Sequence, residues 1–598
     1  MTRRTESRRE WLAALLLCLL VSAVAALPFF YIGEDRAVGC CGGEVPITHD
    51  AWMHFNQMQA FACGLAAGRV YPRWDEATYG GYGAPALSFY PPGAYYLTSF
   101  WYLVTRDWQR VWLLTWWTML FASGLALYAY ARELLGHRAA LFAMTMYVVM
   151  PYHLLNQYQR GALAEQLSFV WMPLCLLFAE RLGAQAAWPA DRAAGAAATA
   201  ADATARRPGC LRSQVCGLAL CYGAFLFSHP PTAYQFTLVF GVFIAGLALW
   251  RGQWRALALL AAALLFGAML AGAYFIPAFL EQALIHANDI SETWPYHTTY
   301  VFDFQQTRFN HFDPFTVRLD FLWACNAVAL LLAARVLFRW SPAFRQSLRL
   351  TKQNDAANAL WLAAGVFASF LMTRYSAPLG RLIPKLEIGV FAWRMLGLTS
   401  LVVALLAGLC AQAALQEAGK AQRLALAAVA WLLLVGALGV SFWKVVWPVV
   451  RSEAFRANPA HYNFATLPVQ VPRDAPPMPE AQFANAGAGE IEVFVWQPEF
   501  RRLRVRANRA EQLQLRTSDF PGWTAWLDGC AVPITRGPLG NITLVVPAGT
   551  HELVLDFRAT PIRRAANWLT LASCGAWLAL VIHSFKQRSV HGTVGQTV

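Results

Sequence analysis

The feature that most constrains this chain is a series of apolar segments, each long enough to cross a membrane. Runs of roughly 17–25 apolar residues follow one another from residue 11 to residue 446, separated by short stretches rich in arginine. Of the 598 residues, 57% are hydrophobic and only 14% are charged. A backbone in lipid must satisfy its own hydrogen bonds, so such segments form helices. The sequence therefore predicts a polytopic α-helical membrane protein.

The arginines between these segments predict how the chain crosses the membrane. Basic loops stay on the cytoplasmic side. If the short apolar segment 93–105 lies on the membrane surface, the basic loops 183–212 and 339–357 are both cytoplasmic. If that segment crossed the membrane, both loops would face outward. With 93–105 on the surface, two large loops, 32–110 and 278–318, face outward. This arrangement predicts about 12 spans, at 11–31, 111–131, 139–155, 166–182, 213–228, 231–250, 256–277, 319–338, 358–373, 391–415, 424–446 and 566–584.

The formal net charge of +14 has the same origin. A charge of this size could indicate nucleic-acid binding, but the arginines lie in short loops between apolar segments, as the positive-inside rule requires. We therefore expect membrane lipids, and no nucleic acid, as partners of the basic stretches.

Residues 447–565 have a different character. Long apolar runs stop, and short alternating segments appear between Pro-Gly, Asp-Gly and Pro-Ala-Gly turns. The expected strands are Glu490–Trp496, Leu503–Arg506, Gln512–Thr517, Thr524–Leu527, Thr543–Val546 and Glu552–Phe557. The sequence thus predicts three parts: a transmembrane domain over 1–446, a small extracytoplasmic antiparallel β-sandwich over 447–565, and a last span with a cytoplasmic tail over 566–598.

Candidate functional residues begin just after the first apolar segment. His49, Asp50 and His54 crowd together there, and on a helix Asp50 and His54 lie one turn apart on one face. A carboxylate beside imidazoles can act as a base, a proton relay or a metal ligand. The alternative is that Asp50 only caps a surface helix.

A second acidic position follows the third span. Glu165 stands at the expected start of a helix, five residues after Arg160. An acidic residue there also stabilises a helix N-terminus without any further role. Two carboxylates on consecutive outer loops, with an arginine and two histidines beside them, favour a functional site at the outer membrane surface.

The order of these motifs resembles the GT-C superfamily of membrane glycosyltransferases, and most closely the bacterial YfhO-like and pyruvoyl-tetrahydropterin-synthase-related membrane proteins. The resemblance extends over nearly the whole chain. It is carried by His49-Asp50, Tyr71-Pro72-Arg73-Trp74, Gly80-Gly81-Tyr82-Gly83, Phe89-Tyr90-Pro91-Pro92, the stretch 160–165, and Phe520-Pro521-Gly522-Trp523 in the β domain. The Trp-Trp-Asp signature of oligosaccharyltransferases is missing from the outer domain, so the asparagine side chain of a peptide is not the expected acceptor.

The resemblance implies a bacterial protein of the cytoplasmic membrane that moves a sugar from a polyprenyl-phosphate donor to a glycan, lipid or protein acceptor on the outer face. Asp50 and Glu165 would be the catalytic acids, with a divalent metal ion such as Mg²⁺ or Mn²⁺ as a further expectation at these two residues. His49 and His54 would contact substrate. The arginines expected to bind phosphate are Arg73, Arg160 and Arg394.

Two other functions remain open at this stage. A transporter or flippase for lipid-linked glycan would also be polytopic, but it usually shows charges at mid-membrane and internal repeats. A non-catalytic envelope protein could use its β domain to bind glycan.

Overall fold

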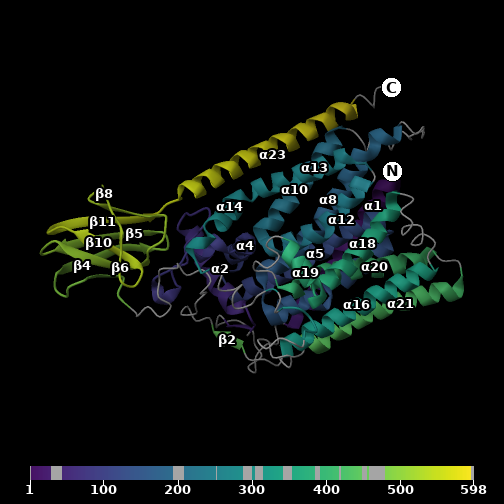
Figure 1. The fold of residues 1–598 in the computed structure, drawn as a ribbon, viewed down its shortest axis with the longest axis horizontal. Helices are drawn as coiled ribbons and strands as arrows, with labels where there is room; N and C mark the ends of the chain where they lie inside the picture. The colour runs from purple at the N-terminus through teal and green to yellow at the C-terminus, as the bar shows by residue number, and fades with distance from the viewer. Residues whose placement is uncertain are drawn as a thin grey trace.

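A bundle of long helices carries a β domain at one end in the computed structural model (Figure 1). The N-terminal end of α1 and the C-terminal end of α23 lie at the opposite end of the bundle. The structure describes residues 2–28, 44–46, 48–192, 208–250, 252–286, 296, 299–303, 314–340, 353–383, 391–416, 419–446, 454–456 and 478–593.

The helices of the bundle follow the expected apolar segments. They are α1 (Thr2–Ala26), α5 (Trp108–Leu134), α6 (His137–Val148), α7 (Pro151–Leu155), α8 (Leu163–Arg192), α10 (Pro208–Ser228), α11 (Pro230–Phe236), α12 (Val242–Trp250), α13 (Trp254–Leu270), α14 (Gly272–Leu280), α16 (Pro314–Trp340), α18 (Gln353–Leu371), α20 (Met395–Gln416), α21 (Lys420–Val440) and α23 (Pro561–Thr593). Three π-helical turns interrupt or end them: η3 (Asn156–Arg160), η4 (Thr237–Gly241) and η9 (Ser441–Val446). The prediction of a polytopic helical protein is confirmed.

The number of spans is lower by strict criteria than the sequence suggested. Within the described residues, nine helices are long and apolar enough to cross a membrane. A tenth is the pair α13 and α14, which bends by 81°. The expected spans 231–250 and 358–373 correspond to α11–η4–α12 and to α18, whose apolar part, Leu360–Leu371, is short. Neither of these two elements is both long and apolar enough to count among the nine.

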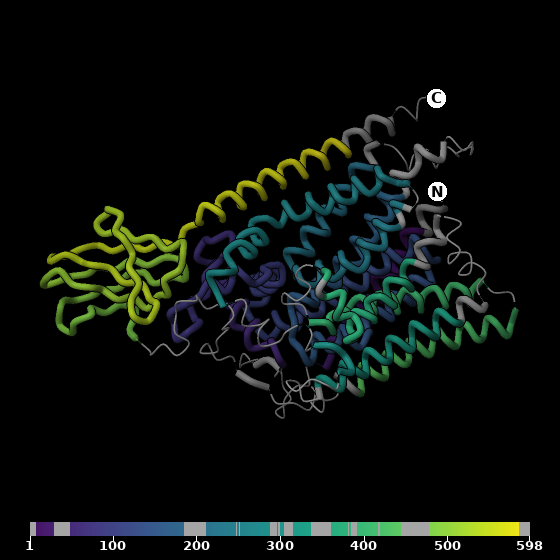
Figure 2. The backbone as a smooth tube through the Cα atoms, viewed as in Figure 1, coloured from purple at the N-terminus to yellow at the C-terminus, as the bar shows by residue number. Residues whose placement is uncertain are grey.

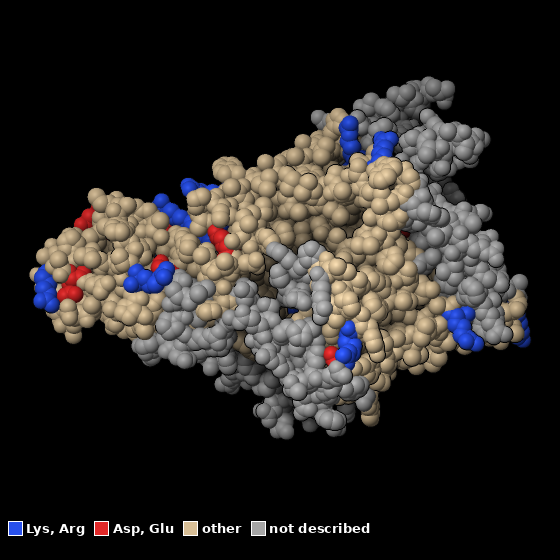
Figure 3. All heavy atoms as spheres, viewed as in Figure 1, with Lys and Arg blue, Asp and Glu red and all other residues tan. Residues whose placement is uncertain are grey.

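Three short helices, α2 (Ala51–Ala66), α3 (Ala86–Phe89) and α4 (Gly93–Thr105), lie between the bundle and the β domain (Figure 2). With 13 residues, α4 is about 20 Å long, which is too short for a hydrocarbon core of about 30 Å. Its length fits the expected surface helix. Charged side chains visible on this face of the molecule gather toward the β domain and toward the opposite end, with a largely uncharged belt between them (Figure 3).

The β domain consists of two antiparallel sheets. One has the strand order β3-β6-β10-β9 and the other β4-β5-β11-β7-β8. Their bounds are β3 (Ala481–Phe483), β4 (Gly489–Gln497), β5 (Phe500–Ala507), β6 (Glu511–Ser518), β7 (Trp523–Leu527), β8 (Cys530–Val532), β9 (Thr535–Arg536), β10 (Asn541–Val546) and β11 (Gly549–Phe557). Inward residues of both sheets share one core, as Leu503 and Leu513 illustrate. The predicted β-sandwich is therefore confirmed, and β3, β8 and β9 are additional strands.

The first large loop completes the core of this domain. The Trp74 ring lies 5.3 Å from that of Trp523 and 5.2 Å from that of Phe557, centroid to centroid. Arg501 of β5 is fully buried and pairs with Glu76 of the loop, at 3.2 Å. Because a buried guanidinium needs a counter-ion, the loop and the β domain form one packed unit.

Candidate active site

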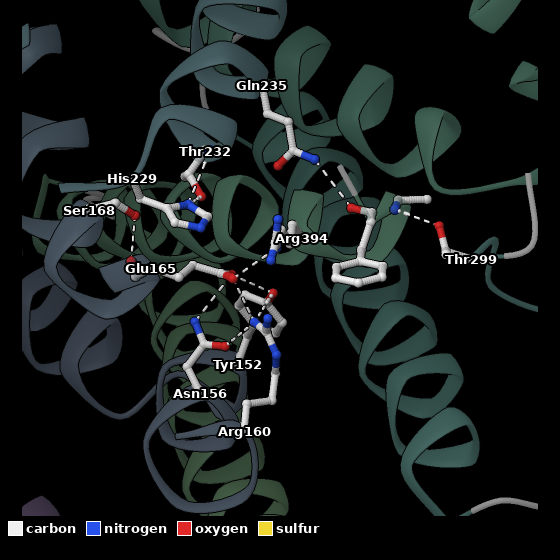
Figure 4. Close-up of polar contacts among 12 residues, drawn as sticks. Tyr152, Asn156, Arg160, Glu165, Ser168, His229, Thr232, Gln235, Thr299 and Arg394 are labelled. Carbon is white, nitrogen blue, oxygen red and sulfur yellow. Dashed lines mark hydrogen bonds and ion pairs between the residues drawn. The ribbon is translucent and has the colours of Figure 1, made fainter. Parts of the chain in front are cut away.

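The side chain of Glu165 lies at the centre of a buried polar cluster (Figure 4). Arg160 Nη1 donates to its Oε2 at 2.7 Å, and Arg394 Nε lies 3.1 Å from the same oxygen. The other oxygen, Oε1, accepts hydrogen bonds from the Tyr152 hydroxyl at 2.7 Å and from Asn156 Nδ2 at 3.2 Å. The glutamate is only 1% exposed. Both of its oxygens are thus occupied, and two arginines compensate its charge.

Local helix geometry assembles this cluster. Tyr152, Asn156 and Arg160 follow one another at intervals of four residues, so they point to one side of α7 and η3. Arg160 Nη1 also donates to the Tyr152 hydroxyl and to Asn156 Oδ1. Gly161 ends the turn in a left-handed conformation with φ 65°, and α8 begins two residues later with Glu165 in its first turn. The helix end thereby turns the glutamate back onto the arginine.

Asp50 is held against this cluster by its backbone. The amide of His49 donates to the carbonyl of Gln159 at 3.1 Å, and the amide of Asp50 donates to that of Arg160 at 2.8 Å. At Gly161 a Cβ atom would lie 2.2 Å from Thr48 Oγ1 and 3.0 Å from the Ala51 nitrogen. The absence of a side chain at Gly161 therefore lets the two acidic loops touch.

The helix-cap explanation for Asp50 does not hold in this structure. Asp50 occupies the N-cap position of α2, but its side chain makes no capping hydrogen bond. Thr48 Oγ1 accepts from the Ala51 amide at 3.1 Å in its place. Within the described part of the chain, no side chain pairs with the Asp50 carboxylate, which is partly exposed. This carboxylate is therefore available to a ligand.

Behind Asp50, the imidazole of His54 is completely buried and bonded at both nitrogens. Nδ1 lies 3.0 Å from the Tyr95 hydroxyl, and Nε2 lies 3.3 Å from the Tyr90 hydroxyl. The Tyr95 hydroxyl donates to Gln57 Oε1 at 2.5 Å. Burial lowers the pKa of His54 to about 4; the negative charge of Asp50 raises this pKa and the positive charge of Arg160 lowers it, and both effects are smaller than that of burial. His54 is therefore neutral at physiological pH.

The remaining predicted residues lie in two different places. Arg394, at the start of α20, joins the cluster and packs over the Phe391 ring at 4.8 Å. His49 is exposed and its ring lies 4.6 Å from that of Phe315. Arg73 instead donates to the carbonyl of Ala273 at 3.0 Å, and its contacts lie with α14, α23 and the β domain. Arg73 thus lies apart from the cluster around Glu165, and phosphate binding by this residue stays a prediction.

The donor set at Glu165 does not fit a divalent cation. Both carboxylate oxygens accept hydrogen bonds, and two guanidinium groups repel further positive charge. In the residues that the structure describes, no group of three or more His, Cys, Asp or Glu side chains could hold a metal ion. A metal at Asp50 remains a prediction resting on one carboxylate.

Several members of the site were not predicted from the sequence. Tyr152 and Asn156 carry no charge and were not singled out, although their spacing from Arg160 was visible. By position alone, five aromatic residues of the first outer loop could stack on sugar rings or belong to an interfacial belt: Trp52, Trp74, Tyr79, Tyr82 and Tyr90. Of these, Trp74, Tyr79 and Tyr82 are at most 1% exposed and pack in the outer-loop and β-domain cores.

Comparisons with known proteins give structural likeness only. No family model matches the chain, and no curated protein matches it. The YfhO-like resemblance therefore stays a prediction.

Several solved structures have a similar arrangement. The archaeal oligosaccharyltransferase AglB from Archaeoglobus fulgidus, in complex with an inhibitory peptide and a dolichol-phosphate, is 12% identical with a TM-score of 0.45, over 75% of this chain and 57% of that one. ArnT from Cupriavidus metallidurans, bound to undecaprenyl phosphate, is 14% identical with a TM-score of 0.37, over 73% of each chain. The arabinofuranosyltransferase AftD from Mycobacteria is 16% identical with a TM-score of 0.39, over 75% of this chain and 28% of that one.

This chain thus spans little more than half of AglB and about a quarter of AftD. With TM-scores below 0.5, these likenesses establish no shared activity. The chain is a polytopic α-helical membrane protein with a C-terminal β-sandwich, and its activity has to be argued from its own residues.

Proposed function

We propose that this chain is a membrane glycosyltransferase that moves a sugar from a polyprenyl-phosphate-linked donor to a hydroxyl group of an acceptor. One observation carries the proposal. The Asp50 carboxylate, with which no described side chain pairs, is held beside the buried cluster of Arg160, Glu165 and Arg394 by two backbone hydrogen bonds. A base next to fixed positive charge is what transfer from a phosphate leaving group requires.

Asp50 is the general base in this proposal. Its carboxylate takes the proton of the acceptor hydroxyl while the oxygen attacks the anomeric carbon of the donor. The bond between that carbon and the phosphate oxygen breaks, and the lipid phosphate leaves with the bonding electrons. Partial exposure of Asp50 gives the acceptor access.

Arg160 and Arg394 stabilise the leaving phosphate. Among the described residues, Arg160 contacts its acceptors through Nη1 alone, so Nε and Nη2 have no protein acceptor there. A guanidinium with free donors binds phosphate oxygens well. Glu165 positions both arginines. Because both of its carboxylate oxygens already contact protein groups, this role suits it better than that of a second base.

The placement of the cluster suits a lipid donor. Glu165 lies in the first turn of α8 and Arg394 directly before α20, and both helices meet the criteria for membrane spans. A phosphate at these helix ends can keep its polyprenyl chain between the helices. We place the site and the β domain on the outer face of a bacterial cytoplasmic membrane, following the arginine pattern of the loops.

The experiment compares the parent protein with Asp50→Asn, both purified and reconstituted in liposomes. A panel of undecaprenyl-phosphate sugars, radiolabelled in the sugar, is offered with a membrane extract as the source of acceptor, and release of undecaprenyl phosphate is measured. Asn keeps the size of Asp but cannot accept a proton, so turnover should fall by about 10²–10⁴-fold.

Asp107→Asn is the matched control. Asp107 is also an N-cap aspartate, and its Oδ1 accepts from the amides of Gln109 at 2.9 Å and Arg110 at 3.0 Å. Asn preserves that role, so turnover should equal that of the parent. Parental turnover in Asp50→Asn would remove the central residue of the proposal, and no turnover of any lipid-linked sugar by the parent would refute the function itself.

A further inference from the structure

Behind Asp50, three hydrogen bonds join Tyr90 to His54, His54 to Tyr95, and Tyr95 to Gln57. A phenol has a single hydroxyl proton, and Tyr95 uses its proton in the bond to Gln57 Oε1. At His54 Nδ1 the Tyr95 oxygen can therefore only accept, so Nδ1 must carry the imidazole proton. The protein thus fixes the tautomer of His54 by a residue one turn away from it.

The other end of the imidazole is fixed by the same logic. A neutral imidazole protonated at Nδ1 presents a lone pair at Nε2, and the pKa of about 4 keeps His54 neutral. The Tyr90 hydroxyl, 3.3 Å away, must donate to that lone pair. The Tyr90 hydroxyl proton is then used in the bond to His54 Nε2. Toward a substrate, the Tyr90 oxygen can only accept a hydrogen bond through its lone pairs.

Tyr90 lies among the charges of the proposed active site. Burial raises the pKa of its phenol, the carboxylates of Asp50 and Glu165 raise it further, and Arg394 and Arg160 lower it. The tyrosine is also partly exposed, unlike Tyr95, which is 1% exposed. Its oxygen thus combines access to the site with a fixed hydrogen-bonding role.

We propose that Tyr90 is a substrate-binding residue whose oxygen accepts a hydrogen bond from a sugar hydroxyl, and that His54, Tyr95 and Gln57 are positioning residues that hold it in the acceptor state. This proposal rests on the proposed function and adds which polar groups of the substrate the site accepts next to Tyr90. A hydroxyl donates to Tyr90, whereas a group that can only accept, such as an ether or a carbonyl, finds no donor there.

The tautomer of His54 is read first, without any substrate. The protein is labelled with ¹⁵N in its histidine rings, and the His54 signals are identified by their loss in His54→Asn. In the parent, the protonated nitrogen should be Nδ1. In Gln57→Leu the Tyr95 proton is released and can turn to His54 Nδ1, so the ring proton should move to Nε2.

Substrate binding is read second, as KM and kcat for the undecaprenyl-phosphate sugar that the parent turns over. Tyr90→Phe should raise KM about tenfold, the worth of one hydrogen bond, with a smaller change in kcat. Tyr96→Phe is the control, because Tyr96 lies next to Tyr95 on α4 and its hydroxyl donates to the carbonyl of Val70, away from His54. Melting temperatures of all variants show that each is folded.

The outcomes separate the two proposals. An Nε2-protonated His54 in the parent, or an unchanged KM in Tyr90→Phe, overturns the role of Tyr90. A parent that turns over no lipid-linked sugar refutes the proposed function, and the role of Tyr90 in binding substrate with it. The His54 measurement still decides how the chain from Tyr90 to Gln57 is oriented, because it needs no substrate.

Discussion

Gly161→Ala tests whether the contact between the two acidic loops is needed for activity. The added Cβ would lie 2.2 Å from Thr48 Oγ1, more than 1 Å inside the ordinary contact distance of 3.4 Å. Because the Ala51 nitrogen also lies 3.0 Å from that Cβ, turning the Thr48 side chain away relieves only part of the conflict. Thr48 Oγ1 also accepts from the Ala51 amide at 3.1 Å, so a Thr48 side chain that keeps this bond pushes the loop bearing Asp50 about 1 Å away from the loop bearing Arg160 and Glu165.

Two effects follow from this substitution. Alanine at φ 65° costs about 1–2 kcal/mol in stability. A displacement of about 1 Å at a reacting group costs about 10²-fold in rate. The variant should therefore fold, melt a few degrees lower and lose most of its turnover.

Gly68→Ala separates the two effects. Gly68 has φ 84° in the outer loop that bears Asp50, and no atom lies within 4 Å of the Cβ that the substitution would add. This control carries the backbone strain without the clash, so it should melt lower and keep parental turnover. Turnover is measured by release of undecaprenyl phosphate and stability by thermal unfolding. Equal turnover in Gly161→Ala and Gly68→Ala would refute the link between loop contact and activity.

Two further predictions concern buried carboxylates. Glu165→Gln leaves Arg160 and Arg394 without a counter-charge and should lower the free energy of unfolding by about 3–5 kcal/mol. Asp50→Asn should unfold like the parent. If Glu165→Gln loses turnover but keeps the melting temperature of the parent, Glu165 has a direct chemical role instead. Burial raises the pKa of Asp75 to about 7 from 3.8, so the folded protein binds this proton more tightly and its stability falls as the pH rises between these values. Asp75→Asn should therefore melt higher than the parent at pH 8 and alike near pH 4, and the same difference at both pH values would contradict this assignment.

The elements of the fold were largely predictable, because their signals are local. Apolar length predicts the helices, and alternation predicts strands such as β5 and β11, each of which is paired along its length with a neighbour. The strands β8 and β9 have three and two residues, and strands this short exist only through their neighbours. No periodicity can develop over such lengths.

The site was predictable only in part, because its remaining contacts join distant parts of the chain. Asp50, Arg160 and Glu165 were identified from their positions after apolar segments, and the structure brings their loops together. Arg73 was expected to bind phosphate, but its partners Ala273 and Asn567 lie hundreds of residues away in sequence. Whether an arginine faces a ligand or a neighbouring helix depends on such contacts.

The packing of Trp74 and Glu76 into the β domain also fixes the parity of membrane crossings. Two segments that share one core lie on the same side of a membrane, so the chain between them crosses it an even number of times. Among the described helices of that interval, seven are unbroken candidate spans. An odd number of the three irregular elements must then cross as well: α11–η4–α12, the bent pair α13–α14, and α18. Either one of the three crosses the membrane or all three do. If all three cross, the chain crosses ten times between Glu76 and the β domain, which is the number that its apolar segments predict.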